Sequence, residues 1–350
     1  MKHTYTTVAL LSTALRLFAN DEVSNMPPNS NHLRYRLEAS FTYWFAKEDG
    51  LNIAESAQVD GSATTVFATS PKVFQQEFGY HPGFKVGAGL SFLEDWEIYG
   101  EYTYYRGENR VSRRAPTGSQ GTGVWSLDSW YLQETFYSHQ SLTGTALSSK
   151  WKLAMDMGDL LLSCPLSQKR GFVYTPFGGL RTVWIRQQMN LDLTVAASSF
   201  GGSSFLGSQP IASHNQSHAW GIGPRVGVDG RYNLPMGFGL DGMIGATLFF
   251  TKFTHVRHSE GAAATYYETP VPVQMSYNCV RPELDLGLGL SWEREIKNKQ
   301  RFNLGVSYDF AYFWGQNMMR SLTDEYVTGV SSGSLDLYFF GVTLKAGYSF

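Results

Sequence analysis

The last sixteen residues alternate between two kinds of side chain. Counting back from the end in steps of two gives only apolar or aromatic residues, namely Phe350, Tyr348, Ala346, Leu344, Val342, Phe340 and Tyr338. From Gly341 to Ser349 the intervening residues are small or polar, and they include Lys345. A period of two puts these two sets on opposite faces of a β-strand. Soluble strands can share this pattern, so the rest of the chain must decide which environment the apolar face meets.

In nine further segments, one of the two alternating sets of residues (one parity) carries no charge. They span about residues 33–45, 84–92, 96–104, 150–157, 174–184, 220–232, 238–250, 280–292 and 302–314. In the segment 150–157 the uncharged parity consists of Trp151, Leu153, Met155 and Met157. The alternation predicts ten antiparallel strands. Residues 125–137 can form one more hairpin, which would make the number twelve.

All charged residues of the ten segments lie on the opposite parity. An Arg or Lys on the lipid face of a membrane barrel costs about 2–4 kcal/mol near the midplane, which explains a strand face without charge. The sequence therefore predicts an all-β fold, a transmembrane antiparallel β-barrel with charged residues lining its lumen. The lumen residues are Arg34, Arg36, Glu38, Lys85, Glu97, Glu101, Lys150, Lys152, Asp156, Arg181, Arg225, Asp229, Arg231, Asp241, Arg281, Glu283, Asp285, Asp309 and Lys345.

Connections between the predicted strands alternate strictly between long and short. The long ones follow the first, third, fifth, seventh and ninth strands, and short turns lie at residues 93–95, 233–237 and 293–300. Outer-membrane barrels have long external loops, short periplasmic turns and girdles of aromatic residues at both interfaces. Trp, Tyr and Phe residues gather at both ends of the predicted strands. Both chain termini are thus expected on the periplasmic side.

Composition agrees with a barrel and excludes some other classes. Aromatic residues make up 15% of the 350 residues, there are 36 glycines, and charged residues are only 17%. A net charge of −2 gives no reason to expect nucleic acid as a partner. No stretch of about 18 apolar residues occurs, so no transmembrane helix is predicted.

The N-terminal segment has the outline of a secretory signal peptide. Lys2 precedes an apolar stretch at residues 5–18, and Ala19 is a small residue at its end. An ordinary N-terminal helix is the alternative, since Arg16 interrupts the stretch. We therefore expect a signal peptide at residues 1–19, a flexible lead-in at 20–31 and the outer-membrane barrel at 32–350.

The C-terminal strand resembles the final strand of bacterial outer-membrane barrels. In those proteins the insertion machinery recognises a strand that ends on an aromatic residue, and this chain ends on Phe350. The resemblance implies that Leu344, Ala346, Tyr348 and Phe350 form an assembly signal. It also implies the barrel-assembly machinery and outer-membrane lipid as partners.

Three short segments together resemble one protein family. They are WFAKEDGL at residues 44–51, YTPFGGLR at 174–181 and WGIGPRVG at 220–227. In this order they resemble segments of the Legionella major-outer-membrane-protein-like group, which environmental chlamydiae share, and the similarity runs from about residue 33 to 350. The resemblance implies a pore-forming protein of the bacterial outer membrane, and it supplies no catalytic residues.

The expected function is passive diffusion of small polar solutes through the lumen. The alternative is a plugged structural or adhesive barrel that acts through its external loops. A barrel of about ten strands is little wider than one packed with side chains, and the nearly balanced lumen charges can pair and fill it. Any pore should therefore be small, with a slight preference for anions. The solute and the oligomeric state stay open.

Other kinds of site are weakly represented. His214, His218, His255 and His258 lie at the outer ends of two neighbouring strands, but no clustered Cys or carboxylate joins them, so no metal is predicted. Some ten-stranded barrels are proteases with Asp and His pairs at the rim. The candidate for such a pair here is Asp128 or Asp324 beside a loop His. Paired carboxylates are missing from the sequence pattern, so we predict neither an enzyme nor a cofactor.

The two cysteines are expected at opposite ends of the barrel. Cys164 falls in a short turn and Cys279 at the outer end of a strand, too far apart for an intramolecular disulfide, and cross-linking between molecules stays open.

Closure of the barrel requires the first and last strands to pair. Glu38 and Lys345 would then approach each other across the seam, with an offset of about two residues.

Overall fold

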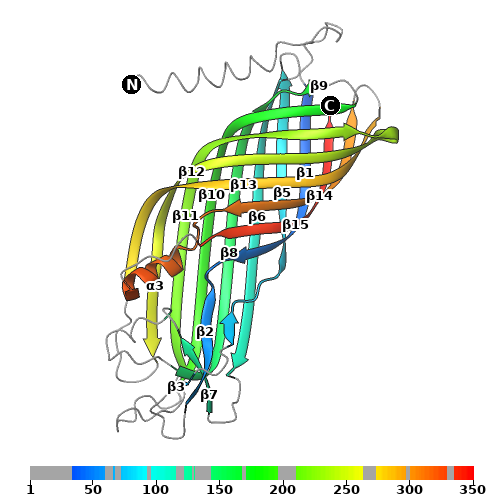
Figure 1. Cartoon of the computed structure of the whole chain (residues 1–350). Coiled ribbons are helices and arrows are strands. Elements are labelled where there is room, and N and C mark those ends of the chain that lie inside the picture. Colours follow the sequence, from blue (N-terminus) through cyan, green and yellow to red (C-terminus); the bar gives the residue numbers. More distant parts are fainter. Residues whose placement is uncertain are drawn as a thin grey trace, which may run out of the picture.

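A computed structural model shows ten long strands closed into one antiparallel barrel (Figure 1). It describes residues 34–59, 66–67, 72–92, 96–115, 122–127, 130, 143–167, 171–195, 210–262, 273–296, 300–328 and 335–350. The barrel strands are β1 (Arg34–Glu48), β5 (Tyr80–Phe92), β6 (Trp96–Arg114), β8 (Thr143–Ser163), β10 (Phe172–Val195), β11 (Pro210–Asn233), β12 (Phe238–Ala262), β13 (Val273–Glu295), β14 (Arg301–Phe313) and β15 (Leu337–Ser349). Pairing of β8 with β10 and of β1 with β15 completes the ring, which confirms the predicted ten-stranded barrel.

The outer face of the barrel carries a continuous band of exposed apolar side chains. Leu288 on β13 is 64% exposed, and its neighbours along and across the strands are also apolar. Between the aromatic residues at the two ends of the described strands, no charged residue lies on this face. Large exposed apolar surfaces are rare in soluble proteins, so the lipid bilayer is the environment that covers this band.

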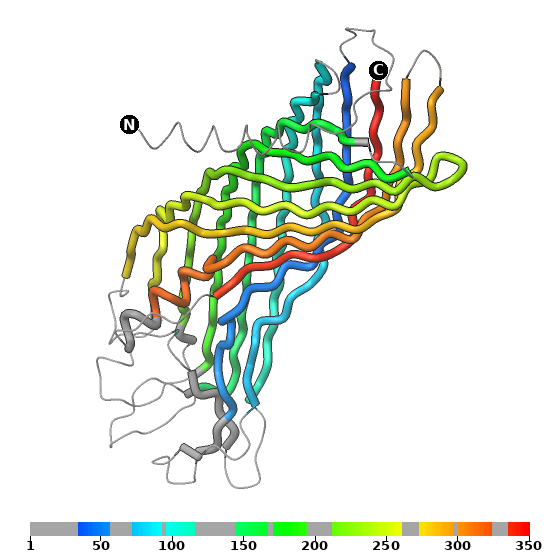
Figure 2. The backbone as a smooth tube through the Cα atoms, turned by 45° about the horizontal axis from the view of Figure 1, so that its top comes forward, coloured from blue at the N-terminus to red at the C-terminus, as the bar shows by residue number. Residues whose placement is uncertain are grey.

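On the external side, the neighbouring strands β6, β8, β10, β11, β12 and β13 continue beyond this band (Figure 2). Strand β8 also pairs there with β7 (Thr122–Leu127). Four short strands accompany them: β2 (Asn52–Val59), β3 (Val66–Phe67) and β4 (Val73–Gln75) outside, and β9 (Leu166–Ser167) at a periplasmic turn. Residues 122–127 pair with β2 outside the ring of ten strands, and the rest of the alternative hairpin, apart from Trp130, lies outside the described residues.

The long connections predicted after the third, fifth and seventh strands are thus partly strand. In β10, Gln187, Met189, Leu191 and Leu193 are buried inside, while residues of the other parity are polar. Alternation persists there, but polar side chains face water and apolar ones face the interior. The predicted strand bounds relied on an uncharged outer face, which only the membrane requires. These strands were therefore predicted to end too early, at the edge of the membrane.

Helical structure is minor in the described residues. The 3-10 helix η1 (Pro235–Gly237) forms the turn between β11 and β12, and α3 (Met318–Thr328) lies beside the outer ends of these two strands. Within the part of the chain that the structure describes, neither helix is long and apolar enough to cross a membrane.

The face assigned to strand β8 was wrong. Trp151, Leu153, Met155 and Met157 are at most 5% exposed and pack inside the barrel. Lys150, Lys152 and Asp156 therefore lie on the outer face instead of in the lumen. The physical reason is that this part of β8 lies beyond the membrane, where the barrel interior is an apolar core and the outer face meets water and headgroups.

The predicted closure between the first and last strands is confirmed. In the register of β1 and β15, Glu38 lies opposite Gly347, and Lys345 lies opposite Ser40. The offset is thus two residues, and Lys345 Nζ lies 2.9 Å from Glu38 Oε1. The two charges hold the periplasmic end of the seam together on its lumen side.

Deleting Phe350 should impair outer-membrane assembly. Its backbone N–H donates to the Tyr35 carbonyl at 2.9 Å, the Tyr35 N–H donates back at 2.8 Å, and the two rings stack with centroids 5.5 Å apart. Deletion removes the ring and this hydrogen-bonded pair at the seam. The amount of folded protein in outer-membrane fractions measures the effect, and normal levels would contradict it. Val342→Leu, which keeps an apolar residue on the same face outside the assembly signal, is the control.

Candidate functional site

A layer of buried charges crosses the middle of the barrel. Arg181 on β10 donates to Asp159 on β8 through Nε (2.6 Å) and Nη2 (2.7 Å), and to Glu283 on β13 through Nη1 (2.5 Å). Arg225 on β11 donates to Asp285 on β13 through Nη1 at 2.8 Å. All five side chains are at most 10% exposed. Since β11 and β12 separate β10 from β13, the contact between Arg181 and Glu283 spans the lumen rather than adjacent strands.

Lys85 extends this layer to the opposite wall. Its ammonium on β5 lies 3.6 Å from Asp309 Oδ2 on β14 and 5.0 Å from the ring centre of Trp44. Trp44 Nε1 donates to Thr343 Oγ1 at 3.1 Å, and Thr343 in turn donates to Asp309 at 2.7 Å. The charged layer is therefore hydrogen-bonded to the aromatic residues directly outside it.

A second, apolar layer fills the lumen on the external side of the charges. Ring centroids lie 5.2 Å apart for Tyr105 and Phe339, 5.9 Å for Phe313 and Phe339, 6.1 Å for Trp44 and Phe339, and 6.4 Å for Phe249 and Phe313. Side chains from β8 and β10 complete the cluster, among them Trp151, Leu153, Met155, Met157, Val183 and Ile185. Apolar side chains from both halves of the ring of strands thus meet in the lumen.

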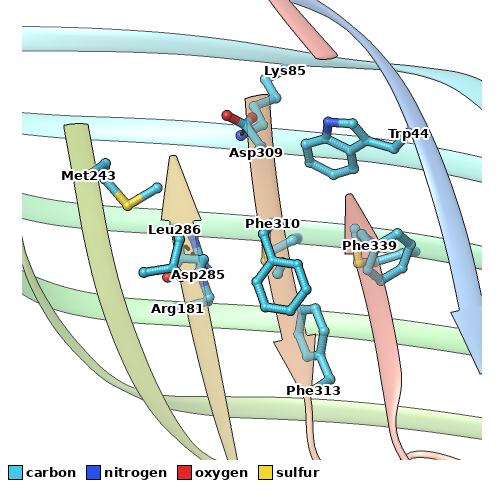
Figure 3. A pocket seen from close by; sticks show the side chains of 13 residues that line it. Trp44, Lys85, Arg181, Met243, Asp285, Leu286, Asp309, Phe310, Phe313 and Phe339 are labelled. Atoms are coloured by element: carbon cyan, nitrogen blue, oxygen red, sulfur yellow. Dashed lines mark ion pairs between the residues drawn. The ribbon is translucent and has the colours of Figure 1, made fainter. Parts of the chain in front are cut away.

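A small cavity lies between the two layers. Trp44, Arg181, Asp285 and Phe313 are among the side chains that point toward it from different strands (Figure 3). Its volume is about 30 Å³, which is room for only one or two water molecules. Solutes larger than water do not fit between the layers in this conformation.

The periplasmic end of the lumen is more open. Arg36 Nε lies 3.1 Å from Glu97 Oε1, and the Tyr99 hydroxyl donates to Glu38 at 2.7 Å. The side chains of Arg36 and Lys345 are 36% and 41% exposed, against 5% for Arg181 in the central layer. Water therefore reaches the inner mouth but not the centre.

The remaining predicted lumen residues occupy several levels of the barrel. Glu101 accepts a hydrogen bond from Tyr99 at 3.2 Å, and Arg281 Nη2 lies 3.9 Å from Met318 Sδ at the external end. Arg231 lies 3.1 Å from Glu293 and 4.0 Å from Asp241 near the periplasmic rim. Two others share the interior parity of their strands, Arg34 at the inner rim and Asp229 on β11.

Sequence reasoning missed Asp159, which the structure places at the centre of the charged layer. The predicted strand ended at residue 157, and its charged parity was taken as the even one. The sequence does carry a signal for Asp159, namely a shift of the apolar residues from odd to even positions along this strand. Along β8, apolar residues occupy odd positions up to Met157, whereas Leu160 and Leu162 at even positions are 58% and 40% exposed outside. That change of parity puts Asp159 in the lumen.

The four histidines do not form one group. His258 is buried inside the external part of the barrel, with Nδ1 2.8 Å from Asn215 Oδ1 and Nε2 2.8 Å from Glu260 Oε1. His218 and His255 face outward with ring centroids 5.4 Å apart, and His214 is exposed. Among the described residues, no three His, Cys, Asp or Glu side chains come together as metal ligands.

The other chemical candidates are not assembled in the described structure. Asp128 and the side chain of Asp324 lie outside the described residues. Cys164 lies in the connection from β8 to β10 and Cys279 in the external half of β13, and the two form no disulfide.

Comparison with known proteins yields one family and several barrels of solved structure. A family model described as Legionella pneumophila major outer membrane protein precursor matches residues 26–350. A search of curated proteins gives no match. The outer membrane protease OmpT of Escherichia coli is 10% identical with a TM-score of 0.47, covering 93% of this chain and 99% of that one. A major outer membrane protein of Thermus thermophilus is 10% identical with a TM-score of 0.29, covering 91% and 100%.

Proposed function

The chain belongs to the Legionella pneumophila major outer membrane protein family, and on this premise we propose that its barrel is closed by its own side chains and acts at the cell surface through its external strands. The barrel lies in the bacterial outer membrane. A closed lumen leaves the external wall as the part of the molecule that meets other molecules.

The contact of Arg181 with Glu283 is the observation that carries this proposal. It joins two strands three positions apart in the ten-stranded ring at 2.5 Å, and both side chains are at most 5% exposed. Separating a buried ion pair leaves uncompensated charges and is strongly unfavourable, by about 3–5 kcal/mol. A solute path through the centre would require this separation together with displacement of the aromatic layer.

The structured external wall supports a role at the surface. Beyond the membrane band, β10 and β11 remain paired up to Thr194 and Pro210, and their interior is filled by apolar and hydrogen-bonded side chains. Ser213 donates to the Trp130 carbonyl at 2.8 Å, which ties this wall to residues between β7 and β8. A rigid extension of this kind presents a fixed surface for contact.

Catalysis is not part of the proposed function. Each carboxylate of the central layer contacts a cation: Asp159 and Glu283 contact Arg181, Asp285 contacts Arg225, and Asp309 contacts Lys85. These carboxylates face cations inside the barrel, whereas a general acid or base must lie within hydrogen-bond reach of its substrate.

A porin is the second candidate, and the open inner mouth favours it. Glycines line the lumen there, including Gly89, Gly289 and Gly347, and the exposed Arg36 and Lys345 would admit small anions. Diffusion through the whole barrel then requires a second conformation in which the central layers part.

Conductance in planar lipid bilayers distinguishes the two candidates. We expect the purified, folded protein to insert without stepwise conductance, because the cavity between its layers holds only one or two waters. Insertion is verified separately by protease protection of protein reconstituted in liposomes. Reproducible conductance steps from the wild-type protein would overturn the closed barrel, and weak anion selectivity would then support the porin.

A further inference from the structure

Four basic side chains gather on the outer face of the barrel at the external edge of the membrane band. This outer basic cluster consists of Arg106 on β6, Lys150 and Lys152 on β8, and Arg186 on β10. Tyr104 and Trp184 end the uncharged band on β6 and β10, and Arg106 and Arg186 are the next outward residues on the same strands. The cluster therefore lies at the height where lipid headgroups begin.

Asp156 on β8 fixes the two guanidinium groups of the cluster, which lie on the strands to either side of it, β6 and β10. Arg106 Nη2 donates to its two oxygens at 2.9 and 2.7 Å, and Arg186 Nη2 donates at 3.1 Å. Arg106 Nη1 also donates to the carbonyls of Tyr105 and Met155, at 2.7 and 2.9 Å. Arg106 is thereby held rigidly, while the side chain of Arg186 is 53% exposed and has further N–H groups to offer.

The cluster keeps an excess of positive charge. Among the described residues, its four basic groups pair with two carboxylates, Asp156 and Glu108, and Glu108 lies 2.5 Å from Lys150 and 3.8 Å from Lys152. Partial burial, with the nearby charges of His255, Arg186 and Arg257, lowers the pKa of the adjacent His218. Four basic groups against two carboxylates leave the described part of this face with a net positive charge.

An open groove runs along this face. Its lining includes Arg106, Lys152, Arg186, Gln188 and His218 from four neighbouring strands. Guanidinium and ammonium groups converging on one groove are suited to a phosphate group, which accepts several charge-assisted hydrogen bonds. The outer face of β1, three strands from β8 in the ring, differs, because Lys47 there packs 5.3 Å over the Tyr338 ring and lies 3.9 Å from Asp49.

We propose that the outer basic cluster binds the phosphorylated sugar headgroup of an outer-leaflet lipid. The apolar surface on the membrane side of the cluster favours a lipid over a soluble phosphate as the ligand. Leu160, Leu180 and Trp184 lie there on adjacent strands and are 58%, 49% and 46% exposed. Acyl chains attached to the headgroup would cover these side chains while the phosphate contacts Arg186 and Lys152. This inference depends on the membrane position of the barrel and not on whether its lumen conducts.

Native mass spectrometry of the full chain in detergent, titrated with lipid A carrying two phosphates, tests the proposal. We expect binding to the wild-type protein, and loss of at least about tenfold in affinity for the double variant Arg186→Ala with Lys152→Ala, because charge-assisted hydrogen bonds are removed. Lys47→Ala removes an outward cation at a similar height on β1, outside the cluster. It should change the affinity by less than about twofold.

Three results would overturn the proposal. Equal binding of lipid A from which the phosphates have been removed would show that acyl chains alone provide the affinity. Complete competition by millimolar inorganic phosphate would show a site for free phosphate. An equal loss for Lys47→Ala and for the double variant would show unspecific attraction to the whole protein. The double variant should keep the unfolding transition of the wild type, since both side chains are largely exposed.

Discussion

Replacing Arg181 with leucine should lower the free energy of unfolding by about 3–5 kcal/mol, because Asp159 loses its cation and Glu283 keeps only Arg225, at 3.7 Å. Asp159 and Glu283, the partners of Arg181, have side chains only 3% and 0% exposed. Urea-induced unfolding in detergent micelles, followed by tryptophan fluorescence, measures the change. Water cannot replace the lost guanidinium easily, since the adjoining cavity is small.

Two further variants show whether burial is the cause. Arg301→Leu removes a guanidinium that lies 3.2 Å from Glu293 but is 50% exposed, so it should cost only about 0–1 kcal/mol. Combining Arg181→Leu with Asp159→Leu and Glu283→Leu should recover much of the loss, because no unpaired charge then remains. Equal losses for Arg181→Leu and Arg301→Leu would contradict a buried charged layer.

Barrel class, strand number and closure could be predicted from the sequence because the membrane imposes a simple rule. Any charge on the lipid face is costly, so one parity of each strand stays uncharged along the whole band. Closure follows because an unpaired strand edge is unfavourable in lipid. With the ends of strands β1 and β15 known, even the approach of Glu38 and Lys345 could be placed to within two residues.

The same rule failed where the strands leave the membrane. In β8, Leu160 and Leu162 face lipid, while Trp151, Met155 and Met157 face the interior of the same barrel. Lipid attracts apolar residues outward, whereas water beyond the membrane drives them inward. A single strand obeys both rules in turn, and the sequence shows the transition only as a shift of apolar parity between residues 157 and 160.

The partners within the charged layer could not be predicted from strand order. Neighbouring strands give cross-strand pairs directly, but Arg181 and Glu283 are three strands apart in the ring. Their meeting depends on barrel diameter, strand tilt and stagger, which local sequence does not specify. A nearly balanced set of lumen charges was visible in the sequence. Whether these charges line an open pore or pair across it depended on that geometry.

Leu286→Arg should sharply reduce assembly into the outer membrane, whereas Gly287→Arg, one residue along β13, should assemble. Leu286 lies on the outer face between Ile244 and Phe310, where an Arg costs about 2–4 kcal/mol near the midplane. Gly287 faces the lumen, and a Cβ there would lie 3.4 Å from Asp309 Oδ1, so an Arg would reach a carboxylate. Folded protein in outer-membrane fractions, detected by heat-modifiable electrophoretic mobility, measures both variants. Since a shift of one residue exchanges the two faces of a strand, equal assembly would show that the register of β13 is wrong.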